Sequence, residues 1–200
     1  MTSLLLQKGA HDLDVIHWLA GGYTRRVTGL GDLAVYGDIT SRRDNSDRTL
    51  WDWYSADNWP PTAQTDPNPV IDVEDISMLQ MRLDNGVLAS YQQCHFTPDY
   101  WRNYTVIGDA GRLENVGDDG GDVIHVWTSR HSSARHPERE GGATDTSPVA
   151  AREAVAAGCA GADSLRTGSA PVDVAPLDPD LVAHFEVGTT EAGPPSRAGV

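Results

Sequence analysis

Residues 8–22 read KGAHDLDVIHWLAGG, and the fold of the chain can be worked out from them. The apolar residues Val15, Ile16, Trp18 and Leu19 recur at spacings of one, three and four residues, which predicts an amphipathic helix. Gly21-Gly22 follows and offers the left-handed residue that ends a helix. His11 lies four residues before Val15, so we expect it at the edge of the buried face. It can be a core histidine with a satisfied hydrogen bond or a residue that borders a cleft.

Composition excludes several classes of function. The 200 residues carry a net charge of −14, from 29 acidic residues against 15 Lys and Arg. Such a surface disfavours nucleic acid and anionic membranes as partners, because both need dense basic patches. Cys94 and Cys159 are too few for a disulfide framework and predict thiols in a reducing compartment. The apolar run 4–6 is too short for a signal peptide or a membrane span. We therefore expect a cytoplasmic chain with one substantial core.

A long irregular segment, residues 37–74, follows β-prone sequence at 23–36. It is rich in Asp, Asn and Pro, and it contains four aromatic residues, Trp51, Trp53, Tyr54 and Trp59. Disordered segments are poor in aromatic residues, so we expect order here. The segment is interpreted as a packing loop or subunit arm, with a substrate lid as the alternative.

Alternating strands predict an antiparallel sheet from residue 75 onward. The expected strands are 76–83, 87–96, 104–107, 112–116 and 122–128. Asp84-Asn85-Gly86 predicts a tight turn between the first two of these strands. After a polar linker at 129–148, Ser147-Pro148 predicts the start of a helix that runs to Leu165. A short strand at 172–174 precedes a tail, 187–200, that we expect to be disordered.

Several stretches together resemble one protein family. KGAHDLDVIHWLAGG resembles the signature of the second domain of the glucose–fructose oxidoreductase / inositol dehydrogenase / MocA (Gfo/Idh/MocA) family. Residues 75–95 and 104–114, the latter with VIGDAGRLE, resemble its central hairpins, and the run 147–174 resembles the closing helix and last strand. The resemblance implies an α+β fold, an open, mainly antiparallel β-sheet with helices on one face. It makes residues 1–186 a substrate-binding and oligomerisation domain whose free sheet face forms a homo-oligomer.

The same resemblance implies an activity. Members of the family oxidise a sugar, cyclitol or related polyol by hydride transfer to NAD or NADP. They bind the cofactor in an N-terminal Rossmann domain, which also supplies a lysine from a Glu-Lys-Pro motif. Neither is found in these 200 residues, so we expect the chain to bind no cofactor and to be inactive alone, with the Rossmann domain as its missing partner. The alternative is a non-catalytic binding or scaffolding module that retains the fold.

The resemblance also assigns the candidate site. His11 matches the family histidine that hydrogen-bonds the hydroxyl undergoing oxidation, which makes it both catalytic and substrate-binding. The aspartate that dehydrogenase members place four residues earlier is Gln7 here, which cannot stabilise an imidazolium as a carboxylate would. The adjacent Lys8 offers a cation, so it is the second catalytic candidate. Asp12 is a candidate for substrate binding, although it can instead complement the helix dipole, as Asp14 can.

Two further residues, His95 and Arg102, follow the strand that ends at Cys94. In the resembled fold this strand end lies beside the substrate cleft, so both are candidates for binding sugar hydroxyls or a carboxylate. The alternative is a polar loop without a ligand.

Two other motifs are set aside. Gly29-Leu30-Gly31-Asp32-Leu33-Ala34 matches the dinucleotide pattern G-x-G-x-x-A, with Asp52 about 20 residues further on. However, the pattern needs a buried strand before it and a helix after it, and the sequence predicts neither. His11 and His17 are six residues apart on a helix and face different ways, so no metal site is expected.

Overall fold

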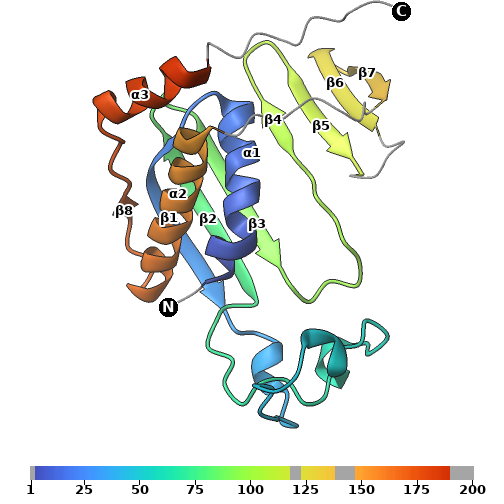
Figure 1. Ribbon diagram of the computed structural model, residues 1–200. Coiled ribbons are helices and arrows are strands. Elements are labelled where there is room, and N and C mark those ends of the chain that lie inside the picture. Colours follow the sequence, from blue (N-terminus) through green and yellow to red (C-terminus); the bar gives the residue numbers. More distant parts are fainter. Residues whose placement is uncertain (1–2, 118–122, 138–146, 190–200) are drawn as a thin grey trace, which may run out of the picture. The chain divides into compact units, whose positions relative to one another are not determined.

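The computed structural model describes residues 3–117, 123–137 and 147–189. The chain divides into two compact units, one formed by residues 1–95 with 146–200 and the other by residues 96–145. Each unit has its own antiparallel sheet of four strands (Figure 1). The α+β class and the antiparallel pairing predicted from the sequence are confirmed, with the strands divided between two sheets.

The first unit is built on a sheet of order β3-β2-β1-β8. Its strands are β1 (Thr24–Asp32), β2 (Ile76–Leu83), β3 (Leu88–Cys94) and β8 (Val172–Asp173). β2 and β3 form the predicted hairpin, and Gly86 in its turn has a φ of 87°. Glycine takes this left-handed conformation without steric cost, which is why the Asp84-Asn85-Gly86 turn suits the position.

Helices cover one face of this sheet. They are η1 (Leu5–Gly9), a single π-helical turn that continues into α1 (Ala10–Ala20), then α2 (Pro148–Arg166) and α3 (Pro179–Thr189). Along β2, residues 77, 79, 81 and 83 are buried, while 78, 80 and 82 are exposed. This alternation leaves one face under α1 and α2, as Figure 1 shows, and the other face open. The prediction of helices on one face is therefore confirmed.

Helix α1 matches its predicted range but turns a different side to the core. It ends where Gly21 takes a φ of 65°, and the Gly21 N–H donates to the carbonyl of His17 at 2.9 Å. Leu13 is fully buried and Ile16 packs against the same core. Trp18 was predicted in the buried stripe, yet 75% of it is exposed. The sheet is approached by the side of α1 that carries Leu13 and His17, and Trp18 lies outside that contact.

Helix α2 lies close to its neighbours because of two glycines. A Cβ added at Gly158 would lie 2.9 Å from the carbonyl oxygen of Leu5, and one at Gly161 would lie 2.7 Å from Cδ2 of Leu79. Both distances are shorter than carbon and oxygen atoms tolerate, so a side chain at either position would push α2 away. Leu5 and Leu79 are fully buried at the centre of the core that results.

Between β1 and β2 the chain forms no strand, as the sequence predicted. It contains three short 3-10 turns, η2 (Tyr36–Asp38), η3 (Leu50–Asp52) and η4 (Pro61–Ala63). Residues 37–74 are called the arm from here on. Figure 1 shows the arm leaving the sheet beyond the end of β1 and returning at the start of β2.

The second unit is a sheet of order β4-β5-β6-β7. Its strands are β4 (Thr105–Ile107), β5 (Arg112–Val116), β6 (Val123–Ser129) and β7 (Ser132–Pro137). The prediction of a polar linker at 129–148 is corrected here, because β6 and β7 pair in a hairpin whose turn contains His131 at a φ of 62°. A strand at the edge of a sheet tolerates polar side chains, so composition alone did not reveal it.

The tail also differs from its prediction. α3 extends to Thr189, so the first residues of the expected disordered tail, 187–189, are helical, and 190–200 lie outside the described residues. The start of α3 carries a signal that the sequence reading missed. Asp178 accepts the N–H of Asp180 at 2.9 Å and Pro179 is the first helical residue, the same arrangement as Ser147-Pro148 before α2. Among the described helices, none is long and apolar enough to cross a membrane.

Candidate functional site

The candidate residues of the first unit gather at one end of its sheet. η1 and the first turn of α1 lie against the last residues of β3, since a Cβ at Gly9 would be 3.4 Å from both Gln93 Oε1 and Tyr91 Cε1. β1 and β3 run in the same direction and end there, as their arrowheads in Figure 1 show. The structure therefore brings Lys8, His11, Asp12 and His95 to a common end of the sheet.

His11 is exposed on the first turn of α1, and Lys8 is half-buried in η1, three residues before it. The buried side of α1 runs through Asp12, Leu13 and His17, so His11 faces solvent instead of the edge of the core. An imidazole in this position is accessible to a ligand. Gln7, in the preceding turn, is also exposed.

Asp12 is buried and fixed to the sheet. Its Oδ2 accepts a hydrogen bond from the Tyr91 hydroxyl at 2.8 Å, and the same hydroxyl lies 3.1 Å from Gln93 Oε1. Gln93 is buried in turn and donates from Nε2 to the Ser77 hydroxyl at 2.9 Å. This polar chain from α1 through β3 to β2 holds the first turn of the helix in place. Tyr91 and Gln93 lie two residues apart in β3, so both side chains point to the helix-covered face of the sheet.

His95 follows β3 and is held through its backbone. Its N–H donates to the carbonyl of Asp75 at 2.9 Å, and its carbonyl accepts the Tyr36 hydroxyl at 2.9 Å. Its ring Nε2 is buried and, among the described residues, has no hydrogen-bond partner. Burial lowers the pKa of His95, which Asp75 and Glu74 oppose only in part. A neutral ring is therefore favoured, and its buried Nε2 is left without a hydrogen bond from the described residues.

Asp75 is a residue that the sequence reading did not single out, and it organises the start of the arm. One carboxylate oxygen accepts the N–H of Ala34 at 2.7 Å, and the other accepts those of Val35 and Tyr36, both at 2.8 Å. Three backbone donors on one carboxylate fix the loop that carries Tyr36. Burial raises the pKa of Tyr36, with smaller contributions from Tyr54 and Asp75, so this phenol stays protonated as a donor to His95.

Arg102 belongs to the second unit. Its guanidinium lies over the Tyr100 ring, 4.8 Å from the ring centre, and its carbonyl accepts a hydrogen bond from Asn115 Nδ2 at 2.9 Å. Asn115 also donates to the carbonyl of Gly117 and accepts the N–H of Tyr104. The buried Asn115 amide thus determines the course of the backbone around Arg102.

The two motifs set aside from the sequence have structural roles. Gly29 and Gly31 lie within β1 rather than at a strand-to-helix turn. Added Cβ atoms would lie 2.7 Å from the Gly161 carbonyl oxygen and 2.9 Å from that of Ile76, so both glycines permit close packing. His17 is buried, and its Nε2 lies 2.8 Å from Thr24 Oγ1, whereas His11 faces solvent. Within the described ranges, no group of three His, Cys, Asp or Glu residues is arranged to hold a metal ion.

Comparisons with known proteins identify the fold. The sequence model of one protein family, the GFO/IDH/MocA C-terminal domain, matches residues 2–114 of this chain. Levoglucosan dehydrogenase, solved as a complex with NADH and levoglucosan, superposes with a TM-score of 0.56 at 14% identity, over 84% of this chain and 49% of that one. A putative oxidoreductase from Thermotoga maritima gives 0.55 at 14% identity, over 83% of this chain and 45% of that one.

The same fold occurs in a regulatory protein. The super-repressor mutant of Gal80p from Saccharomyces cerevisiae superposes with a TM-score of 0.54 at 14% identity, over 87% of this chain and 50% of that one. The chain thus spans about half the length of the solved structures that it resembles. No curated protein matches its sequence. Since the family model covers more than half of the residues, the chain belongs to the Gfo/Idh/MocA oxidoreductase family and contains its C-terminal domain.

Proposed function

We propose that this chain is the substrate-binding portion of an NAD(P)-dependent oxidoreductase that acts on a sugar, cyclitol or related polyol. The observation that carries the proposal is the pair of histidines at one end of the first sheet, the exposed His11 and the buried, unpartnered Nε2 of His95. Two similar structures support it by their ligands: one contains NADH and levoglucosan, and another, from Agrobacterium radiobacter, contains NAD+ and L-tartaric acid.

In this proposal His11 hydrogen-bonds the hydroxyl that is oxidised and accepts its proton as the carbon gives up its hydride, and Lys8 stabilises the negative charge that develops on the oxygen. His95 holds a second hydroxyl through Nε2. Asp12 positions the helix turn that carries His11, because its carboxylate is tied to Tyr91. The nicotinamide of the complete enzyme supplies the hydride acceptor. Arg102, in the second unit, is a separate candidate for binding a hydroxyl or a carboxylate, with its guanidinium over the Tyr100 ring.

The cofactor is proposed to bind outside these residues. A dinucleotide site needs a glycine-rich turn at the N-terminus of a helix, where backbone N–H groups meet the pyrophosphate. The G-x-G-x-x-A sequence here lies in β1 and the residues after it, where Asp75 already binds three backbone N–H groups. A Rossmann domain is therefore the proposed partner of this chain.

The test is turnover of the full-length protein on a polyol panel with the His11→Ala variant. Loss of a positioned acid–base or hydrogen-bonding group lowers kcat by about 100-fold or more. His184→Ala is the matched control, since His184 is an exposed histidine on α3. Wild-type turnover by His11→Ala would refute the role of His11.

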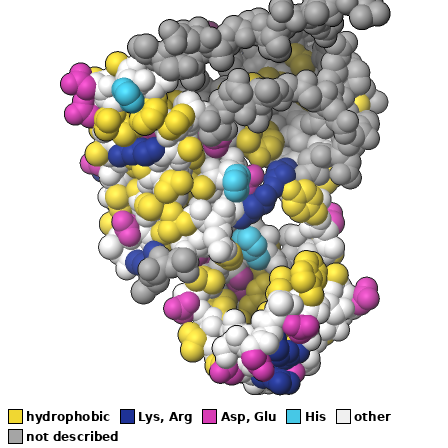
Figure 2. All heavy atoms as spheres, viewed as in Figure 1, with side chains coloured by type: hydrophobic (Ala, Val, Ile, Leu, Met, Phe, Trp, Pro, Cys, Tyr) yellow, Lys and Arg dark blue, Asp and Glu magenta, His cyan; other side chains and the backbone are white. Residues whose placement is uncertain are grey.

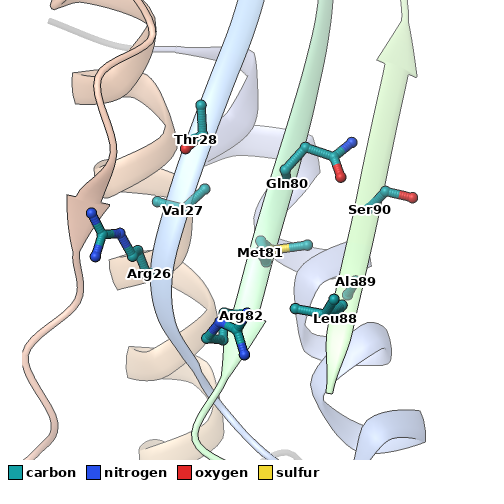
Figure 3. A pocket seen from close by; sticks show the side chains of 9 residues that line it. All are labelled: Arg26, Val27, Thr28, Gln80, Met81, Arg82, Leu88, Ala89 and Ser90. Carbon is teal, nitrogen blue, oxygen red and sulfur yellow. The ribbon is translucent and has the colours of Figure 1, made fainter. Parts of the chain in front are cut away.

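We also propose that the open face of the first sheet forms a homo-oligomer. A hollow of about 320 Å³ lies on this face, lined by side chains that include Arg26, Arg82 and Leu88 in one cross-strand row (Figure 3). The exposed Leu30 and Asp32 lie farther along β1 on the same face. An antiparallel second copy would place the arginines of one copy opposite Asp32 of the other. Sedimentation of the Leu30→Asp variant tests this contact. Its sedimenting mass is expected to be smaller than that of the wild type.

A non-catalytic module is the second candidate function. It is favoured by Gln7 in place of the family aspartate and by the likeness to Gal80p, whose solved form is a super-repressor. Turnover of the full-length protein with NAD or NADP on the polyol panel separates the candidates. Turnover that His11→Ala abolishes supports the oxidoreductase, whereas polyol binding in isothermal titration without any turnover supports the non-catalytic module.

A further inference from the structure

The hollow on the open face of the first sheet is lined by two cross-strand rows of side chains (Figure 3). One row consists of Arg26, Arg82 and Leu88, which lie opposite one another on β1, β2 and β3. The next row along the same strands consists of Thr28, Gln80 and Ser90. A small molecule in the hollow would therefore meet two guanidinium groups, two hydroxyls and an amide.

The two arginines form a pair of like charges. Arg26 and Arg82 are direct cross-strand partners, an arrangement that destabilises a sheet when both side chains carry the same charge. Arg26 is compensated only in part. Figure 3 shows it extending toward β8, where its one described acidic contact, Asp173, is 3.7 Å away and largely exposed. The Arg82 side chain makes no ion pair or hydrogen bond with the described residues. The row thus retains positive charge without a partner.

The second row supplies hydrogen-bonding groups. The side chains of Thr28, Gln80 and Ser90 make no hydrogen bond with the part of the chain that the structure describes. Hydroxyls and amides can each donate a hydrogen bond to an oxygen atom. Side chains two residues apart on one face of a strand are separated by roughly 7 Å. A ligand with several oxygen atoms that lies over Arg82 can therefore reach both rows.

The hollow also differs in charge from the chain as a whole. The chain carries a net charge of −14, yet none of the described residues that line the hollow is Asp or Glu. Figure 2 shows the other, helix-covered side of the first sheet, where Lys and Arg side chains lie apart from one another and Asp and Glu side chains are interspersed. Two arginines without a carboxylate between them create a local positive potential, which attracts anions.

From this arrangement we propose that the hollow binds a small oxyanion, the phosphate or carboxylate group of a small molecule. Arg82 holds two oxygen atoms of the anion in a bidentate pair, and Arg26 adds a second positive charge from the neighbouring strand. Gln80 and Ser90 donate to the remaining oxygen atoms. The volume of about 320 Å³ is at the small end of the range for ligand pockets, roughly 300–1,000 Å³, and therefore suits a molecule of few carbon atoms.

This anion site is separate from the proposed polyol site. Leu88 is the first residue of β3, whereas His11 and His95 lie where β1 and β3 end. The inference therefore goes beyond the proposed oxidoreductase activity and does not depend on it. It does share Arg26 and Arg82 with the proposed contact between copies, in which Asp32 of a second copy lies opposite the same arginines. Since both use the same guanidinium groups, a bound anion and that contact should compete.

The test is isothermal titration of the full-length protein with inorganic phosphate and with succinate, which separate the two sources of the anion. At least one of them is expected to bind. Arg82→Gln is expected to weaken this binding by about 10-fold or more, because it removes a charged, bidentate partner. The affinity should also fall as NaCl is raised from about 50 to about 300 mM, since salt screens exposed charges.

Two further variants make the test specific to the hollow. Arg166→Gln removes the same charge from the exposed end of α2, where the guanidinium is bonded to the Ala162 carbonyl at 3.3 Å, and it is expected to leave the affinity unchanged. Asp173→Asn removes the carboxylate that competes for Arg26, so it should strengthen anion binding by about 2- to 5-fold. Equal weakening by Arg82→Gln and Arg166→Gln would reduce the effect to net charge and overturn the site.

The remaining outcomes separate the anion site from the contact between copies. Phosphate is expected to lower the sedimenting mass of the wild type, because it occupies the arginines that face Asp32. Phosphate binding that Arg82→Gln abolishes, with an unchanged sedimenting mass, would keep the anion site and overturn the Asp32 contact. If neither the wild type nor Asp32→Asn binds phosphate or succinate, the anion site is wrong. The proposed polyol oxidation would stand in that case, since turnover with His11→Ala tests it independently.

Discussion

Helix α1 carries one histidine near each end, and their surroundings are opposite. At the first turn, His11 is exposed, beside a buried polar chain that ends at Asp12. At the last turn, His17 is buried, and its Nε2 accepts the N–H of Thr24 at 3.2 Å. Residue type alone therefore does not give the role of a histidine in this helix. The exposure of the two rings differs, and the predictions below are designed to separate the two ends of the helix.

The largest effect is expected where the buried end of α1 meets charged residues. Arg25 lies 2.8 Å from Glu153 and 3.0 Å from Asp84, and Glu153 is only 1% exposed. Arg25→Met leaves a buried carboxylate with the partly exposed Arg152 as its remaining partner, so it should lower the free energy of unfolding by about 3 kcal/mol. Urea unfolding measures this.

The next residue provides the control for that experiment. Arg26 is exposed, and its only described acidic contact is Asp173 at 3.7 Å. Arg26→Met should change stability by less than about 1 kcal/mol. Equal losses of unfolding free energy in the two variants would mean that burial of the Arg25–Glu153 ion pair does not contribute to stability.

A smaller loss is expected at the first turn. Tyr91→Phe removes the hydroxyl that donates to the buried Asp12, and an intramolecular hydrogen bond contributes about 0.5–1.5 kcal/mol. If the polar chain holds the turn of His11 in place, the same variant should also weaken polyol binding. Unchanged stability and binding in Tyr91→Phe would show that this row of hydrogen bonds neither stabilises the fold nor positions His11.

Acid pH should lower the free energy of unfolding through His17, which is buried at the last turn of α1. Burial lowers the pKa of His17 below 6.5, with Glu153, Asp14 and Asp84 opposing this and Arg25 adding to it. Above pH 6.5 the ring is neutral in both the folded and the unfolded chain. As the pH falls below 6.5, the unfolded chain binds a proton first, so stability decreases until the lowered folded pKa is reached.

Melting temperatures between pH 7.5 and 5 measure this contribution. His17→Gln is neutral throughout and should show a shallower decrease than wild type. Parallel curves for wild type and His17→Gln would contradict the assignment.

The smallest effect on stability is expected at the exposed histidine itself. His11→Ala should change the free energy of unfolding by no more than about 0.5 kcal/mol, because the side chain is exposed. Paired with the loss of turnover predicted above, this result would assign His11 to binding alone. A large loss of stability would make it a second structural histidine.

The sequence predicted the parts of the fold that depend on local patterns. The range of α1, its end at Gly21, the turn at Gly86 and the capped start of α2 all follow from spacing and from residues with special backbone preferences. The family, too, was recognised from the run 8–22 together with stretches of the hairpins and of the closing helix.

The parts that were missed depend on contacts between distant residues. Asp75 caps backbone N–H groups about 40 residues earlier, and Tyr91 reaches Asp12 across 79 residues. Trp18 was assigned to the core because periodicity gives the apolar side of a helix but not the side that the sheet approaches. β7 was not predicted because an edge strand can consist of polar residues. The candidate roles of Lys8, His11, Asp12, His95 and Arg102 remain predictions with the tests given above.

The division of the chain has a consequence for how it folds. The second unit is inserted between β3 and α2, so the chain leaves the first unit after His95 and re-enters it at residue 146. During synthesis β1, β2 and β3 emerge early, but Val27 and Leu79 stay uncovered until α2 has been made. This delay exposes an apolar sheet face in the nascent chain, where aggregation competes with folding. Shortening the insertion to a tight connection should therefore raise the yield of soluble first unit, since α2 would then reach the sheet sooner.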